Sequence, residues 1–234
     1  MLIKRSANER GITKTDWLTS FHSFSFGHYF DPNYLGFSDL LVINDDIIKP
    51  RSGFKTHSHR DMEIFTYVLD GTLTHKDSTS TNSATIEKGE IQLMSAGSGI
   101  HHSEHNHDLE NQVHLLQIWI RPDQNNLKPA YQQVKLSKQA QENNFQLIIS
   151  PTGEKNSLVI HQDSFIYAGI FHQTSHTKKL DSSRYYYLHI ASGTLEINGI
   201  NLSAGDGLSI KSESSITITN SHSAELLLFD LRRV

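Results

Sequence analysis

The two halves of the chain contain two pairs of similar segments. In each segment a strand-like run of residues is interrupted by a glycine that indicates a turn. VLDGTLTHKD (68–77) resembles IASGTLEING (190–199), and EKGEIQLMS (87–95) resembles SAGDGLSIK (203–211). The matching glycines are Gly71 with Gly193 and Gly89 with Gly205. A unit that recurs in the same order in both halves predicts two copies of one fold.

The repeated segments are rich in β-branched and aromatic residues, and similar runs occur between them, closed by Gly, Asn, Asp or Ser. The runs expected to form strands are FSFG (24–27), LLVIND (40–45), EIFTYVLDG (63–71), VHLLQIWI (113–120) and YYYLHIASG (185–193). Helical periodicity is scarce, and the best candidate is LSKQAQEN (136–143), where Ser137 is placed to cap a short helix. We therefore expect an all-β fold, as a barrel or a sandwich.

The polar segment RPDQNNLKPAY (121–131), with its two prolines, is the expected connector between the copies. The first domain is then expected over residues 1–133 and the second over residues 134–234. A chain of 234 residues is long enough for two cores of this size.

The amino-acid composition excludes several classes of function. The formal net charge of −4 provides no basic field for nucleic-acid phosphates, so direct nucleic-acid binding is not expected. The absence of cysteine excludes disulfides and sulfur ligation of a metal, and suits a reducing compartment. No apolar run approaches the roughly 20 residues of a membrane span, and the N-terminus is charged. We therefore expect a cytoplasmic protein that does not bind membranes. A monomer is the expected state, although the sequence leaves the oligomeric state open.

Fifteen histidines are the one anomaly of composition, and two of them form an H-x-H pair at His57 and His59. Side chains alternate faces in a strand, so this pair projects from one side with α-carbons about 6.5 to 7 Å apart. His102 and Glu104 repeat the spacing. If the two strands are neighbours, three nitrogens and one carboxylate oxygen surround a common point. A lone H-x-H pair is usually exposed, but the joint pattern favours a metal site with an open position.

The residues around these histidines resemble the two motifs of the cupins. The first motif is seen in Gly53, His57, His59, Glu63 and Gly71, and the second in Gly89, Ser95, Gly97, His102 and Asn106. The short first spacing, Ser95 at a position where proline is common, and two extra residues before His102 depart from the general pattern. These departures resemble one branch, the pirins, as do FHSFSFGHYFDP, GFKTHSHRDMEIFTYVLDG and MSAGSGIHHSEHN. The resemblance covers nearly the whole chain and is strongest to bacterial pirin-like quercetin 2,3-dioxygenases.

The resemblance implies an all-β bicupin of two stacked, jelly-roll-like β-barrel domains with few short helices. It implies one divalent transition metal in the first domain, with Fe(II) expected and Mn, Co, Ni, Zn or Cu as alternatives. The implied ligands are His57, His59, His102 and Glu104. Glu63 is the alternative carboxylate ligand, and is otherwise expected to orient a histidine beside the metal. His101 is expected to be exposed or to line the rim of the site.

Counting from the repeat glycines gives the positions in the second copy that match the four ligands. These positions are Lys179, Asp181, Ile218 and Asn220. They do not form a metal-binding set, so the second domain is expected to be a scaffold without metal ligands.

The activity that the resemblance implies is cleavage of a flavonol such as quercetin with O₂ and release of carbon monoxide. Glu104 or Glu63 is the expected acceptor of the flavonol proton. The aromatic residues expected to line the site are Phe24, Phe26, Phe65, Tyr67 and Trp119. The alternatives are a non-catalytic, redox-sensing regulator that binds a protein partner, and a small-molecule binder without turnover.

Overall fold

The computed structural model describes all 234 residues, and its regular secondary structure consists almost entirely of strands. The chain divides into two compact units. The N-terminal unit comprises residues 11–136 and 160–162, and the C-terminal unit comprises residues 1–10, 137–159 and 163–234. The boundary at residue 133 stays a prediction. No helix in the structure has the length and apolar character needed to cross a bilayer.

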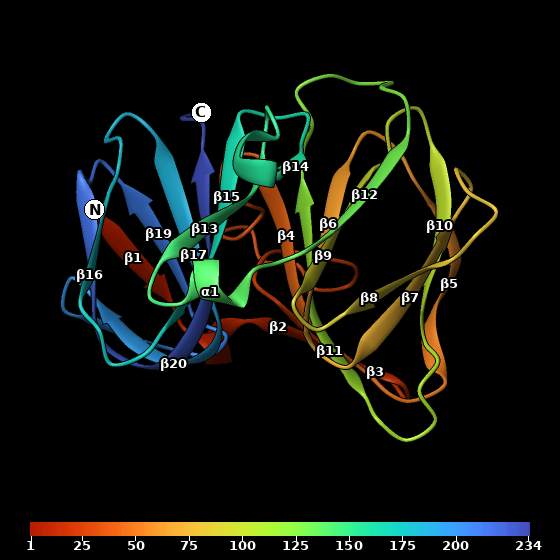
Figure 1. Cartoon of the computed structure of the whole chain (residues 1–234), viewed down its shortest axis with the longest axis horizontal. Helices are drawn as coiled ribbons and strands as arrows, with labels where there is room; N and C mark the ends of the chain where they lie inside the picture. Colours follow the sequence, from red (N-terminus) through yellow and green to blue (C-terminus); the bar gives the residue numbers. More distant parts are fainter. The chain divides into compact units, whose positions relative to one another are not determined.

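The N-terminal unit contains two antiparallel sheets that face each other (Figure 1). The larger sheet has the order β12 (Ala130–Lys135), β9 (Glu90–Ser95), β6 (Glu63–Asp70), β11 (Val113–Ile120), β4 (Leu40–Ile48), β3 (Leu18–His22) and β2 (Gly11–Lys14). The smaller sheet has the order β5 (Ser52–His59), β10 (Ile100–Asn106), β7 (Thr72–Asp77) and β8 (Ala84–Glu87). Two sheets packed in this way are typical of the jelly-roll class of all-β domains.

Apolar residues from both sheets fill one end of this unit. A cluster of buried side chains joins Ile48, Val68 and Val113 of the larger sheet to Leu73 and Ile86 of the smaller one. Elsewhere in the larger sheet, buried positions are polar instead, and they include Asn44, Gln92 and Gln117. Because buried polar side chains need partners, this polar region marks where the unit places its chemistry.

The C-terminal unit has one nine-stranded sheet. Its main order is β1 (Leu2–Arg5), β19 (Gly207–Lys211), β17 (Tyr185–Ile197), β20 (Ser215–Leu231), β15 (Ser164–Phe171), β13 (Phe145–Ser150) and β14 (Leu158–Val159). Two further strands, β16 (His176–Lys179) and β18 (Ile200–Ser203), pair with β20 and β17. The register of the long strands β17 and β20 shifts at several points, which lets them bend around a core of aliphatic and aromatic side chains.

The all-β prediction is confirmed, and four of the five expected strands exist as β4, β6, β11 and β17. The prediction of a strand at 24–27 is wrong, because Gly27 adopts a φ of +58° and the segment makes only an isolated bridge between Phe26 and Tyr29. The predicted helix is α1 (Lys138–Gln141), and the Ser137 side chain accepts from the Ala140 amide at 3.2 Å. The cap is therefore confirmed.

Candidate metal centre

The H-x-H and H-x-E motifs lie on adjacent antiparallel strands, β5 and β10, with His102 directly opposite His57. A register shift follows, so that Glu104 stands opposite Phe54. One ring nitrogen from each of His57, His59 and His102 lies within 4.8 Å of the other two. The structure thus brings together three of the four predicted ligands around one point.

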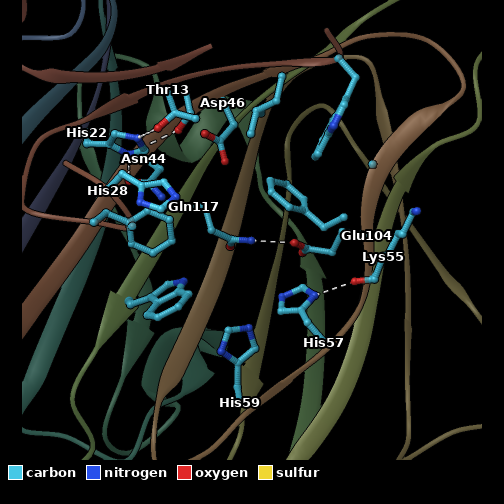
Figure 2. Close-up of a pocket in the computed structure, with 18 of the residues that line it drawn as sticks. Thr13, His22, His28, Asn44, Asp46, Lys55, His57, His59, Glu104 and Gln117 are labelled. Carbon is cyan, nitrogen blue, oxygen red and sulfur yellow. Dashed lines mark hydrogen bonds between the residues drawn. The ribbon is translucent and has the colours of Figure 1, made fainter. Parts of the chain in front are cut away.

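The donor atoms of this cluster fit a bound divalent transition metal. The Nε2 atoms of His57 and His102 lie 3.0 Å apart. Two nitrogens that bind one ion at about 2.1 Å and at right angles to each other have this same separation. The His57 Nδ1 lies 2.8 Å from the Lys55 carbonyl and donates to it, which leaves the Nε2 lone pair facing the cluster (Figure 2).

The other two imidazoles are also held in the form that binds a metal. Burial, with the neighbouring His57, lowers the pKa of His59 to about 4. Burial likewise lowers the pKa of His102 to about 4, although the nearby Glu104 carboxylate opposes that effect. Because only a neutral imidazole has a lone pair for a metal, both rings are ready to bind one at neutral pH.

The fourth predicted ligand, Glu104, is buried beside His102 and belongs with it and His75 to a second group of potential ligands. Its Oε1 accepts from Gln92 Nε2 at 2.8 Å. Its Oε2 accepts from Gln117 Nε2 at 2.7 Å (Figure 2). Burial opposes ionisation, but the neighbouring His75 and the other surrounding histidines hold the pKa of Glu104 below its ordinary value. The group is therefore an oriented carboxylate at neutral pH.

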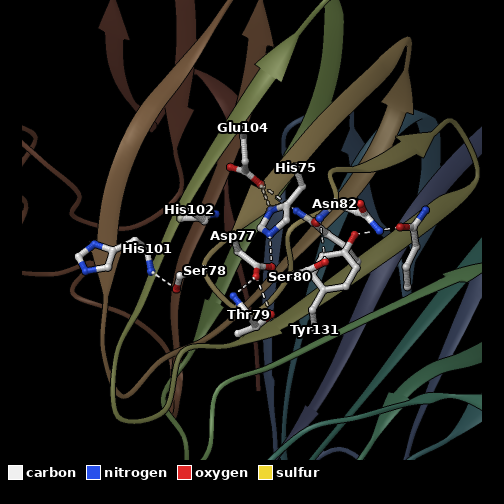
Figure 3. A network of polar contacts seen from close by, with 12 residues as sticks. His75, Asp77, Ser78, Thr79, Ser80, Asn82, His101, His102, Glu104 and Tyr131 are labelled. Carbon is white, nitrogen blue, oxygen red and sulfur yellow. Dashed lines mark hydrogen bonds and ion pairs between the residues drawn. The ribbon is translucent and has the colours of Figure 1, made fainter.

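His75 and Asp77 both belong to β7, and His75 lies between Asp77 and Glu104 (Figure 3). His75 Nε2 lies 2.8 Å from Asp77 Oδ2, and its Nδ1 lies 4.0 Å from Glu104 Oε1. The His75 ring also stacks on Tyr131, with centroids 4.9 Å apart. We did not expect this pair from the sequence, although the H-x-D spacing inside the repeat VLDGTLTHKD is a signal that could have shown it.

Glu63 lies apart from both groups of potential ligands. Its Oε2 accepts from Ser95 Oγ at 2.8 Å, and its Oε1 lies 3.3 Å from His161 Nδ1. Burial raises the pKa of this carboxyl. The histidine that Glu63 contacts is thus His161, a residue that the sequence did not single out, rather than one of the clustered histidines. Its predicted roles at the metal and in proton transfer stay predictions, and this position does not support them.

His57, His59 and Glu104 open onto a cavity of about 660 Å³ inside the N-terminal unit, which is a usual size for a small-molecule site. Two of the five aromatic residues expected here line it, Phe26 and Trp119. The other three, Phe24, Phe65 and Tyr67, are buried in the core and do not line the cavity. The exposed His101, next to His102 in the chain, does not reach it either.

The two-sheet fold, the histidine cluster and the cavity together define a cupin-like protein with a group of histidines that could hold a metal ion beside a cavity of small-molecule size. Comparison with known families agrees with this class. The Pirin profile matches residues 5–120, and the profile of the quercetinase C-terminal cupin domain matches residues 147–231. The chain belongs to the pirin family.

Relatives match along the full length of the chain. A quercetin 2,3-dioxygenase of Escherichia coli is 43% identical over 232 residues, covering 99% of each chain. A pirin-like protein of Caulobacter vibrioides is 38% identical over 232 residues, covering 98% of this chain and 99% of its own. The crystal structure of the bacterial pirin YhhW from Escherichia coli in complex with nickel(II) superposes with a TM-score of 0.94, at 43% identity and full coverage of both chains.

Proposed function

We propose that this pirin is a metal-dependent dioxygenase that cleaves flavonols such as quercetin with O₂ and releases carbon monoxide. The observation that carries the proposal is the cluster of His57, His59 and His102, of which His57 and His59 line a cavity of small-molecule size. The relative named quercetin 2,3-dioxygenase supports the choice of substrate. The nickel(II) complex of YhhW supports a divalent transition metal, and Fe(II) stays the expected ion.

In this proposal His57, His59, His102 and Glu104 hold the metal. When bound, the ion supplies Lewis acidity that lowers the pKa of a flavonol hydroxyl. Gln92 and Gln117 fix both oxygens of Glu104 by hydrogen bonds, so this carboxylate keeps one orientation.

Of the two carboxylates predicted to accept the flavonol proton, Glu104 lines the cavity and Glu63 does not. Glu104 is ionised at neutral pH, so it is able to accept a proton from a hydroxyl brought beside it. The aromatic rings of Phe26 and Trp119 meet edge to face at the cavity wall, with centroids 5.3 Å apart, and offer apolar surface for the flavonol rings.

The test loads the purified protein separately with Fe(II), Mn(II), Co(II) or Ni(II) and follows the loss of quercetin absorbance in air, together with the carbon monoxide released. We expect turnover with at least one metal. His57→Ala should remove the bound metal and lower activity by more than about 100-fold, since it deletes a ligand. The control His101→Ala changes an exposed histidine one residue from a proposed ligand, and should leave metal content and activity within about twofold of wild type.

Tight metal binding without turnover for any of the four ions would overturn the enzymatic proposal and favour a regulator that acts through a protein partner. Comparing the metal content of Glu104→Gln and Glu63→Gln tests the fourth ligand. We expect the first substitution to reduce metal content and the second to leave it unchanged.

A further inference from the structure

The cavity beside the metal centre has a second polar end, formed by side chains that the proposed chemistry does not use. Figure 2 shows His57, His59 and Glu104 on one side, and Thr13, His22, Asn44 and Asp46 gathered on the other. Trp17, Leu18, Phe26 and Phe54 line the cavity as well and make its wall largely apolar. A ligand held at the metal end would therefore extend across an apolar stretch to a second set of polar groups.

This polar end is a consequence of the pairing of β3 with β4. Ser20 stands opposite Asp46 and His22 stands opposite Asn44, so all four side chains project from the same face of the sheet. Asp45, between Asn44 and Asp46, projects from the other face, where its Oδ1 lies 2.6 Å from His114 Nε2. The strand thus places two neighbouring aspartates in opposite environments.

After the hydrogen bonds inside the polar end are formed, some polar groups remain available to a ligand. His22 uses both ring nitrogens, with Nδ1 2.7 Å from Asn44 Oδ1 and Nε2 2.8 Å from Thr13 Oγ1. Because Asn44 engages His22 through its oxygen, its amide nitrogen is left for an acceptor. Ser20 donates a hydrogen bond to the Asp46 carboxyl, but the Asp46 Oδ1 has no partner.

Asp46 is only 2% exposed, so this partnerless oxygen is shielded from bulk water. An unsatisfied buried oxygen is costly, and in a cavity of this kind it indicates a position that a polar ligand group completes. Burial also raises the pKa of Asp46 to about 7. Near neutral pH the group is therefore present in both forms, one that accepts from a hydroxyl and one that also donates to it.

We propose that Asp46 and Asn44 form a subsite that recognises hydroxyl groups on the end of an aromatic ligand remote from the metal. The subsite selects polyhydroxylated aromatic molecules over analogues that carry only the metal-binding oxygens. It rests on the proposed function for its choice of ligand, while its test measures binding and not turnover.

The test compares quercetin with 3-hydroxyflavone, which shares the 3-hydroxyl and 4-carbonyl oxygens but lacks the other hydroxyls. Kd values are measured by calorimetry on the metal-loaded protein without O₂. We expect wild type to bind quercetin at least about tenfold more tightly, which is the usual effect of a hydrogen bond to an ionisable buried group. Asp46→Ala should weaken quercetin binding about tenfold and leave the Kd for 3-hydroxyflavone within about twofold.

Two further variants control this comparison. Asp46→Asn keeps an acceptor oxygen at the same place and should retain part of the discrimination between the two flavonols. Asp45→Asn removes the neighbouring carboxylate from the opposite face of β4 and should leave both Kd values unchanged.

The outcomes separate the subsite from the proposed function. Equal weakening of both flavonols in Asp46→Ala, unchanged binding of both, or failure of wild type to bind either would overturn the subsite. If wild type discriminates and Asp46→Ala does not, the subsite stands even when quercetin is not consumed in air. If quercetin is consumed but discrimination survives in Asp46→Ala, the function stands and the subsite is overturned.

Discussion

Asp46 carries a carboxyl group at a position where its charge is poorly solvated. Burial raises its pKa from 3.8 to about 7, mainly because the ionised form loses its hydration. Between these two values the folded state binds more proton than the unfolded state. The stabilising contribution of the protonated group is therefore fully present below about pH 4 and is lost as the pH rises to about 7.

Asp46→Asn should remove this pH dependence, because an amide does not titrate. Relative to wild type, the free energy of unfolding of the variant should rise by roughly 2 to 4 kcal/mol between pH 4.5 and pH 7.5 and stay level above that. Urea denaturation of both proteins across this pH range measures the difference between their free energies of unfolding. The other titrating groups are the same in both proteins, so their effects cancel in this difference. A difference that is the same at every pH would show that the carboxyl is solvated in the folded state.

Single residues also show how far sequence reasoning reaches. The four proposed ligands could be predicted because their spacing is local, two residues apart on each of two strands. The residues that hold Glu104 were not found, because Gln92 and Gln117 lie on β9 and β11 with no local motif around them. Nothing in the sequence distinguishes these glutamines from exposed ones until the sheets are packed.

At the scale of the elements, the glycines of the repeat mark positions where the backbone adopts a left-handed conformation. Gly71 links β6 to β7 with a φ of +78°, and a Cβ there would meet the Gln112 carbonyl oxygen at 2.7 Å. Gly193, its repeat partner, has a φ of +72° and a comparable approach to the Ser223 carbonyl oxygen. Gly89 has a φ of +80° but open space around it. Gly71 lies in a turn and Gly193 lies within β17, so the repeat preserves a left-handed glycine at which the chain also passes close to another segment.

The different surroundings of Gly71 and Gly89 predict how much stability is lost when each is replaced by alanine. Gly89→Ala should lower the free energy of unfolding by about 1 to 2 kcal/mol, the cost of a left-handed backbone alone. Gly71→Ala should cost about 2 kcal/mol more, since the backbone of residues 112 and 113 must also move. Urea denaturation followed by tryptophan fluorescence compares the two variants. Equal losses would contradict the crowding at Gly71.

Local sequence patterns predict the strands themselves but not how the strands pair. The strands at β4, β6, β11 and β17 were predictable from apolar runs, since a buried strand must present such side chains. The pairing of β5 with β10 and the register shift between His102 and Glu104 are set by contacts distant in sequence. A shift of this kind turns side chains relative to one another, which decides where Glu104 sits beside the histidines.

At the scale of the whole molecule, each unit buries its own core, and both groups of potential metal ligands belong to the N-terminal unit. A metal that binds the folded unit and not the unfolded chain stabilises that unit by mass action. Both tryptophans of the chain, Trp17 and Trp119, also lie in the N-terminal unit. Tryptophan fluorescence therefore reports on the unfolding of the unit that carries the site.

Metal removal should accordingly lower the Tm seen by tryptophan fluorescence. At a free ion concentration of about 100 times Kd, the stabilisation is about 2.7 kcal/mol, which corresponds to roughly 10 °C for a unit of this size. A chelator should reverse the shift, His101→Ala should keep it, and His57→Ala should abolish it because a proposed ligand is lost. If His57→Ala still gained the full shift, the ion would be binding elsewhere in the chain, and the cluster of His57, His59 and His102 would not be the metal centre.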